Sequence, residues 1–308
     1  MTLLKIGARG SPLSLAQTGL VAKALEEANP GLVTEIVPIK TTGDRIQDAP
    51  LAKIGGKGLF VKEIEEALLD GRIDLAIHSA KDLPAEIPAG LGLGAVPERA
   101  NYRDVLICRH PGGLDALPQG AKLGTSGLRR QAQMLAARPD LIVEPLRGNV
   151  GTRLKKLETE FDATLLAAAG LERLGVAPPN AVELPIEIML PAAGQGILAL
   201  EVREEDVKTS EFLAPLEHRP TAMALSAERG FLRRLGSGCQ LPVAAYAEFI
   251  DGTITLEGLI ASLDGRQVLR DKKTAQLDSA AAASNLGEFM ATMLLDQGGR
   301  AIMDAILK

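Results

Sequence analysis

The chain has 308 residues, of which 46% are hydrophobic and 24% charged, with glycine and proline spread along its length. This composition is typical of a globular protein and excludes collagen-like and disordered chains, and the length predicts two or three domains. The net charge of -5 gives no overall attraction to nucleic acid or anionic membranes, so a site for an anion must be local. Two cysteines and three histidines at no metal-ligand spacing argue against a disulfide framework and against a metal site.

Targeting signals are also missing from the sequence. The N-terminal segment lacks the basic region and cleavage site of an export signal, and no apolar run approaches about 18 residues. We therefore expect a cytoplasmic protein that neither spans a membrane nor binds nucleic acid.

The N-terminal part alternates strand-like runs with helical periodicity, which indicates wound α/β units. Strands are predicted at residues 3–6, 33–40 and 73–77. A helix that ends at Asp70 and Gly71 precedes the third of these strands. The pattern is βαβαβ, and ligands of such sheets bind beyond the carboxyl ends of the strands.

Ser11 and Pro12 are typical of an N-cap and a first helical turn. The helix that follows is predicted to bury an apolar stripe made of Leu13, Ala16, Leu20 and Ala24.

A second α/β unit is predicted from a strand at residues 105–108 and from strand-turn-helix signals at 122–137 and 141–157. Two short segments, 97–103 and 191–196, flank this unit, and we interpret them as a two-segment hinge between two lobes. Beyond residue 217 the pattern changes to one helix, hairpins with Asp-Gly turns, and an alanine-rich helix. The predicted fold is therefore α/β, with two lobes and a small C-terminal α+β domain. The domain boundaries are 1–98 with 197–216, 101–193, and 219–308.

Arginine recurs where a strand-like run meets the start of a helix. The arginines are Arg9 in GARGSPLSLAQ, Arg129 and Arg130 in GTSGLRRQ, and Arg147 with Arg153 in LRGNVGTRL. Helix N-termini favour anions, and a guanidinium adds a bidentate clamp for carboxylate or phosphate. A surface salt bridge explains any one of them, but their recurrence indicates several anionic groups on one ligand. Carboxylates are the better interpretation because neither GxxxxGK[ST] nor GxGxxG occurs.

Lys53, Lys57 and Phe60 lie in the glycine-rich stretch LAKIGGKGLF. This stretch fits a candidate cleft loop that adds positive charge and equally fits a plain flexible loop.

The stretch IHSAKDLP places Lys81 and Asp82 just beyond the predicted end of a strand. Asp82 fits a carboxylate that stabilises a developing cation or transfers a proton, and it fits equally well a turn cap before Pro84. His78 is interpreted as a core or supporting residue rather than a base.

Cys239 lies in the glycine-rich turn RLGSGCQLPV, where a reactive thiol and a small turn residue are both consistent with the sequence. Cys108 follows an apolar run and is predicted to be a buried structural thiol. Two functional classes therefore stay open on these residues. One is a binding protein for an organic anion, and the other is a hydrolase with Cys239 as nucleophile and His78, His110 or His218 as base.

Six motifs occur in order across nearly the whole chain: HSAKDLP, GTSGLRRQAQ, LRGNVGTRL, AAAGLERLG, PAAGQG and LGSGCQLPVAAYAE. Together they resemble those of the hydroxymethylbilane synthases, also called porphobilinogen deaminases. The resemblance implies a transferase of porphyrin and haem biosynthesis that condenses four porphobilinogen molecules onto a dipyrromethane primer. Ammonia leaves at each step, and the linear tetrapyrrole is finally hydrolysed free. It also implies a three-domain monomer whose first two lobes resemble periplasmic binding proteins.

The same resemblance implies roles for individual residues. Cys239 would hold the dipyrromethane cofactor through a thioether, and Asp82 would be the catalytic aspartate. The implied cofactor-binding residues are Cys239, Lys81, Asp82, Thr125, Arg129, Arg130 and Arg147. The implied residues for porphobilinogen and the growing oligopyrrole are Arg9, Ser11, Gln17, Arg147, Arg153 and Arg173, with Gln195 as a secondary contact. Gly127 is left out of the site because it stands where many members have a serine, and Ser237 stands where glycine is common.

Overall fold

A computed structural model describes residues 2–42, 61–236 and 241–307. The chain forms two compact units, each with its own sheet and cores. The first unit is Met1–Arg99 with Ile197–Ala222, and the second is Ala100–Gly196 with Met223–Lys308. The predicted three-domain boundaries stay a prediction, since the second unit holds both an α/β sheet and the C-terminal region.

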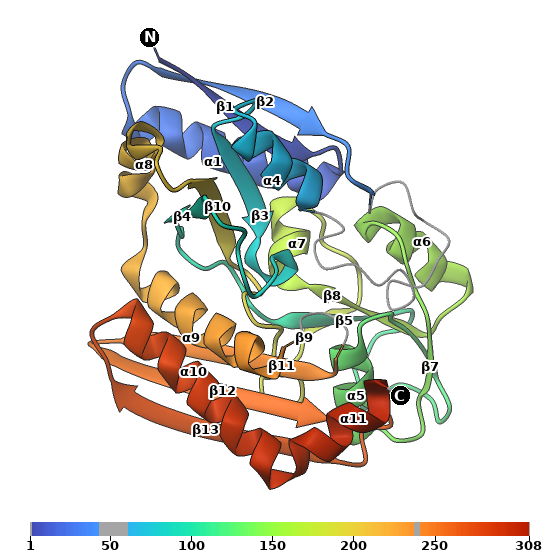
Figure 1. Cartoon of the computed structure of the whole chain (residues 1–308). Coiled ribbons are helices and arrows are strands. Elements are labelled where there is room, and N and C mark those ends of the chain that lie inside the picture. The colour runs from blue at the N-terminus through green and yellow to red at the C-terminus, as the bar shows by residue number, and fades with distance from the viewer. Residues whose placement is uncertain (1, 43–60, 237–240, 308) are drawn as a thin grey trace. The chain divides into compact units, whose positions relative to one another are not determined.

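The sheet of the first unit has the strand order β2-β1-β3-β10-β4 (Figure 1). Its strands are β1 (Thr2–Arg9), β2 (Leu32–Ile39), β3 (Leu75–Ser79), β4 (Leu91–Ala95) and β10 (Leu198–Arg203). β1 pairs in parallel with both β2 and β3, as the βαβαβ pattern predicts. β10, which the sequence analysis did not identify, is antiparallel to β3 and β4 and lies between them.

Helices cover both faces of this sheet. α1 (Pro12–Ala28) and α8 (Val207–Leu213) pack with Leu75 and Ile77 of β3 in one core. α4 (Lys62–Leu69) packs with Ala76 on the opposite face. The alternation along β3 follows from the two-residue period of a strand.

The start of α1 was predicted correctly, but its buried face was not. Ser11 is the N-cap, and its Oγ accepts a hydrogen bond from the Ser14 amide at 3.3 Å. The expected stripe is wrong, because Leu20 is 54% exposed. The residues that α1 buries are Gln17, Thr18, Val21, Ala22 and Leu25. A polar residue occupies this face because Gln17 Nε2 donates to the Ser79 Oγ at the end of β3.

The α/β sheet of the second unit has the order β7-β6-β8-β5-β9. Its strands are β5 (Asp104–Cys108), β6 (Lys122–Gly124), β7 (Ile142–Glu144), β8 (Ala163–Ala167) and β9 (Ala181–Glu183). β6 is parallel to β7 and β8, so these three strands end at one edge. α5 (Leu128–Ala137) contributes Met134 to the core on one face. α6 (Val150–Thr159) and α7 (Ala168–Arg173) pack on the other face.

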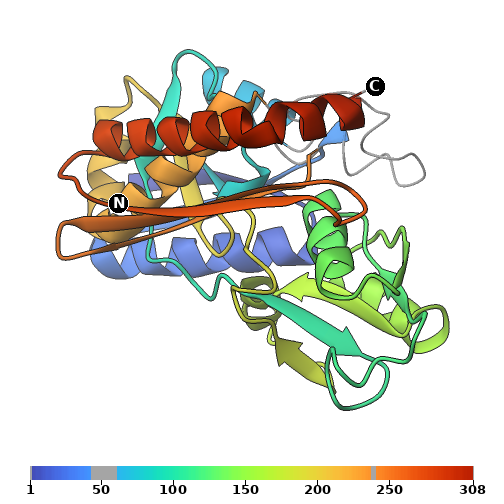
Figure 2. The ribbon, with the colours of Figure 1, turned by 90° about the horizontal axis from the view of Figure 1, so that it is seen from below.

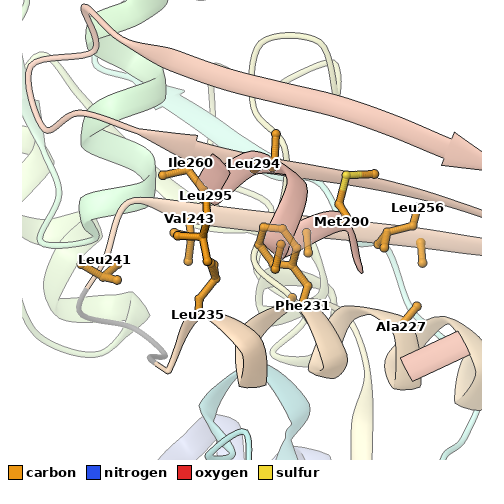
Figure 3. Packing of buried hydrophobic residues seen from close by; sticks show 14 of the residues in the cluster. Ala227, Phe231, Leu235, Leu241, Val243, Leu256, Ile260, Met290, Leu294 and Leu295 are labelled. Atoms are coloured by element: carbon orange, nitrogen blue, oxygen red, sulfur yellow. The ribbon is translucent and has the colours of Figure 1, made fainter. Parts of the chain in front are cut away.

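The C-terminal region is an antiparallel sheet of β11 (Val243–Ile250), β12 (Thr253–Ala261) and β13 (Val268–Gln276). α9 (Arg219–Leu235) and α10 (Ala280–Leu294) pack with this sheet in one core, and α10 runs along it in Figure 2. Figure 3 shows Phe231, Leu256 and Met290 gathered in that core. A π-helical segment, Leu295–Gly299, separates α10 from α11 (Arg300–Leu307).

The predicted α/β fold class is confirmed, with two sheet lobes and a small C-terminal α+β part. Over the described ranges, no helix has the length and apolar character needed to cross a membrane.

Candidate functional site

In the first unit, the carboxyl ends of β1 and β3 carry polar residues at one edge of the sheet. Arg9 ends β1, and Ser11 follows it as the cap of α1. β3 continues directly into a single 3₁₀ turn that contains Lys81 and Asp82. Asp82 is exposed there. Because the two strands are parallel, their ends bring these residues to the same edge.

Gln17 also belongs to this edge, although it is buried. Its Nε2 donates to the Oγ of Ser79 at 3.0 Å, and Ser79 lies three residues before Asp82 in the chain. Gln17 therefore joins α1 to the strand end from which the turn with Asp82 begins.

A buried pair of titratable side chains lies within the same sheet. His78 of β3 and Glu201 of β10 are 5% and 0% exposed, and the His78 Nε2 lies 2.9 Å from the Glu201 Oε2. The interpretation of His78 as a core residue is confirmed. His218 has a different partner, since its Nδ1 lies 2.8 Å from the Thr221 Oγ1.

In the second unit, five predicted site residues lie where β6 leads into α5 and where β7 leads into α6. Thr125 follows β6, and Arg129 and Arg130 are in the first turn of α5. Arg147 lies between β7 and α6, and Arg153 lies in α6 with its Nε donating to the Gly148 carbonyl at 2.9 Å. The parallel strands therefore concentrate arginines at one sheet edge.

Arg129 and Arg130 share a buried carboxylate, that of Asp104 at the start of β5. The Arg129 Nη1 lies 2.8 Å from the Asp104 Oδ2, and its Nη2 lies 3.1 Å from the Oδ1. The Arg130 Nε and Nη2 each lie 2.7 Å from the Asp104 Oδ1. Sequence reasoning did not single out Asp104. Its only signal is an acidic residue directly before the apolar run VLIC.

Burial and neighbouring arginines both act on the pKa values in this arginine cluster. Burial, together with the charges of Arg130 and Arg147, lowers the pKa of Arg153 to about 10. Burial also lowers the pKa of Arg130, and the charge of Arg129 acts in the same direction while Asp104 opposes it. A pKa lowered by neighbouring cations shows that the protonated guanidinium is under repulsion, which a bound carboxylate would relieve.

Two further predicted residues lie in the second unit. Arg173 is the last residue of α7, and its Nη2 donates to the Gly196 carbonyl at 2.7 Å. Burial lowers the pKa of Arg173. Gln195 is fully buried, and its Nε2 donates to the Tyr102 carbonyl at 2.8 Å.

Asp82 belongs to the first unit and the arginine cluster to the second. Cys239 and the candidate cleft loop with Lys53, Lys57 and Phe60 lie outside the described residues. Cys108 is buried as predicted, and burial raises the pKa of its thiol. Within the described ranges, no group of three or more His, Cys, Asp or Glu side chains could hold a metal ion.

The cluster suits a ligand that carries several carboxylates, since guanidiniums bind carboxylates bidentately and four arginines gather at this sheet edge. Fold and site together define an α/β protein with two sheet lobes and an arginine cluster suited to an organic polyanion.

Comparison with protein families gives the particular family. Residues 4–211 match the model described as porphobilinogen deaminase, dipyrromethane cofactor binding domain, and residues 222–296 match the porphobilinogen deaminase C-terminal domain. The chain belongs to the porphobilinogen deaminase family. It is therefore a transferase of tetrapyrrole biosynthesis whose family domain binds a dipyrromethane cofactor.

Solved structures with a similar chain course are distant in sequence. The periplasmic VFT2 domain of Bordetella pertussis BvgS is 15% identical, with a TM-score of 0.40 over 68% of this chain and 85% of that one. The L-cystine solute receptor of Neisseria gonorrhoeae is 14% identical, with a TM-score of 0.40 over 74% of this chain and 91% of that one.

Proposed function

We propose that this chain is a hydroxymethylbilane synthase. It joins four porphobilinogen molecules head to tail onto a dipyrromethane primer held by Cys239, and it releases the linear tetrapyrrole by hydrolysis. Family membership supports porphobilinogen as the substrate. The cytoplasmic location and the monomeric state inferred from the sequence belong to the same proposal.

The observation that carries the proposal is the cluster of arginines at the strand ends of the second unit. Burial lowers the pKa of Arg153, and Arg130 and Arg147 lie close enough for their charges to lower it further. Each pyrrole unit of the substrate carries an acetate and a propionate, so a growing chain presents many carboxylates. Such a ligand explains why a net acidic protein gathers several arginines at one sheet edge.

The two sets of residues would have different tasks. The arginines bind the peripheral carboxylates and orient the rings, which converts binding energy into correct positioning. Asp82, exposed in the 3₁₀ turn after β3, acts on the reacting substrate. Its carboxylate stabilises the cation that forms when porphobilinogen loses ammonia, and it holds the pyrrole N-H groups. When bound, the dipyrromethane supplies the terminal pyrrole to which the first substrate unit is joined.

Intact mass spectrometry tests the proposal directly. Protein purified from a cell that makes porphobilinogen should exceed its sequence mass by two linked pyrrole units. Cys239→Ala should remove the excess, whereas Cys108→Ala should keep it, because Cys108 is buried in the core of the second unit. An unmodified wild-type mass would reject the proposal.

Asp82→Asn tests the assigned role of the carboxylate. The variant should keep its fold and its excess mass but lose about 100-fold or more of its turnover, because the neutral amide cannot stabilise a developing cation. Glu86→Gln is a matched control, since Glu86 is exposed four positions further along the same loop. Turnover within a few-fold of wild type in Asp82→Asn would remove Asp82 from the chemistry.

A further inference from the structure

Asp104 is buried at a position where several segments of the second unit meet. It is 0% exposed at the first position of β5, and both of its oxygens contact guanidiniums of α5. A buried carboxylate with charged partners on one helix fixes their geometry, because each lost contact would leave an uncompensated charge.

The guanidiniums are held on more than one side. Arg129 Nη1 also donates to the Leu190 carbonyl at 2.8 Å, and Arg130 Nη1 donates to the Leu165 carbonyl at 2.9 Å. The Nε-H of Arg129 takes part in none of these bonds. Since a guanidinium has five N-H donors, both side chains keep N-H groups for a further acceptor while Asp104 fixes their planes.

Charge points to the same conclusion. Two guanidiniums meet one carboxylate, and over the described ranges Asp104 is the only acidic side chain that contacts either of them. The group therefore has a net charge of about +1. One further carboxylate would neutralise it. Asp104 thus lowers the repulsion between Arg129 and Arg130 but leaves the pair with a net positive charge for a further carboxylate.

Asp104 also reaches the segment where the chain leaves the second unit. Gln195 donates from its Nε2 to the Asp104 Oδ2 at 3.1 Å and to the Tyr102 carbonyl at 2.8 Å. The first of the two chain segments of the second unit ends at the next residue, Gly196. One carboxylate is therefore bonded both to the arginine pair and to this segment.

We infer that Asp104 is a positioning residue, which holds Arg129 and Arg130 in one arrangement for the carboxylates of the dipyrromethane and joins that arrangement to the segment with Gln195. The inference rests on the proposed function. It adds a residue that itself touches neither cofactor nor substrate.

The test measures loading of the cofactor. Protein made in cells that lack porphobilinogen is mixed with porphobilinogen, and the gain of intact mass is followed in time. Asp104→Asn should take up the cofactor at least about tenfold more slowly than wild type. The substitution removes the carboxylate that pairs with the buried guanidiniums of Arg129 and Arg130. Asp140→Asn is the matched control. It breaks the ion pair between Asp140 and Arg138, just beyond the other end of α5. The Asp140 side chain is 28% exposed and that of Arg138 is 21% exposed. The loading rate of this variant should stay within about twofold of wild type.

A double-mutant cycle separates positioning from a general structural role. Asp104→Asn should add little to the loading defect of Arg130→Gln if Asp104 acts through the arginines. Additive defects would overturn the inference, and so would normal or faster loading of Asp104→Asn. If wild-type protein gains no mass, the proposed function fails instead.

The double variant with Asp104→Asn and Arg130→Gln still tests the inference if Asp104→Asn alone does not fold. It removes one positive and one negative charge and so keeps the net charge of the wild-type group. A folded double variant that loads like Arg130→Gln supports the inference. A double variant that also fails to fold would show that Asp104 serves the core in general, and would overturn it.

Discussion

Buried carboxylates hold distant parts of the chain together at the scale of single residues. Glu228 of α9 is fully buried, and its oxygens accept from the Gly194 amide at 2.5 Å and the Ala247 amide at 2.8 Å. Such a group needs donors because its desolvation is otherwise uncompensated. Glu65 of α4 departs from this pattern. Its Oε1 and the Oε1 of Glu201 are buried without a hydrogen-bond partner in the part of the chain that is described.

Glu65 gives the first unit a pH-dependent stability. Burial, followed by the charge of Glu201, raises the pKa of Glu65, although His78 opposes the shift. The folded protein then binds the proton more tightly than the unfolded chain does. Stability is therefore retained at low pH and lost as pH rises from the ordinary value of about 4.5 through the raised folded value.

Glu65→Gln should remove this loss, since the amide carries no charge at any pH. The urea midpoint of the variant relative to wild type should rise between pH 4.5 and pH 7.5. Glu66→Gln, on the exposed side of the same helix beside Lys62, should show no such trend. A constant difference between Glu65→Gln and wild type across this pH range would contradict the assigned shift.

At the scale of elements, local chemistry predicted where elements begin and turn. The Ser11 cap starts α1 as expected. Asp251 and Gly252 have φ of 48° and 76°, the left-handed pair that a two-residue hairpin turn needs. The face that α1 buries and the strand β10 were not predictable in this way. β10 takes its place through pairing with β3, more than a hundred residues earlier. Its apolar run is interrupted by Glu201, whose Oε2 lies 2.9 Å from the Nε2 of the distant His78.

Close packing between α9 and α10 depends on glycine. A Cβ built at Gly287 of α10 would collide with the carbonyl oxygen of Ala227 in α9, and one at Gly230 of α9 would collide with that of Ser284. Backbone atoms of two packed helices cannot move apart without opening the core that Phe231 and Met290 fill (Figure 3).

Gly287→Ala should therefore destabilise the protein by about 1–3 kcal/mol or more, as overpacking does. Gly19→Ala is the matched control, because Gly19 lies within α1 and a Cβ there meets nothing within 4 Å. That variant should gain about 0.5–1 kcal/mol from the better helix propensity of alanine. Chemical denaturation measures both changes, and equal effects of the two substitutions would contradict the packing argument.

At the scale of the whole molecule, the C-terminal sheet of β11, β12 and β13 shares one core with α5, the helix that carries Arg129 and Arg130. Ala132 of α5 packs with Ala244 and Leu259 of the sheet, on the face opposite α10. Gly265, in the turn between β12 and β13, has a φ of 70° and approaches the backbone of α5. The C-terminal sheet is therefore packed on the helix that carries Arg129 and Arg130. This link had no sequence signal, since it depends on tertiary contact between segments more than a hundred residues apart.

The motifs placed the polar residues at the strand ends of each unit, because strand and helix boundaries are local. They could not show that Arg129 and Arg130 already share Asp104. That contact depends on β5 lying in the same sheet as the strands beside α5, with the antiparallel pairing of β5 and β8 setting the register. The roles of the individual site residues stay predictions.

The two cysteines allow the predicted tether to be tested on the intact chain. Cys108 is 3% exposed and burial raises the pKa of its thiol, so an aromatic disulfide reagent should scarcely react with the native protein. After denaturation, protein that carries the cofactor should have one thiol per chain that reacts with the reagent, since a thioether at Cys239 cannot react. Denatured protein made without porphobilinogen should have two reactive thiols, and denatured Cys108→Ala that carries the cofactor should have none. Two reactive thiols in denatured wild-type protein of full excess mass would place the attachment somewhere other than Cys239, because the added mass would then have left both sulfurs unmodified.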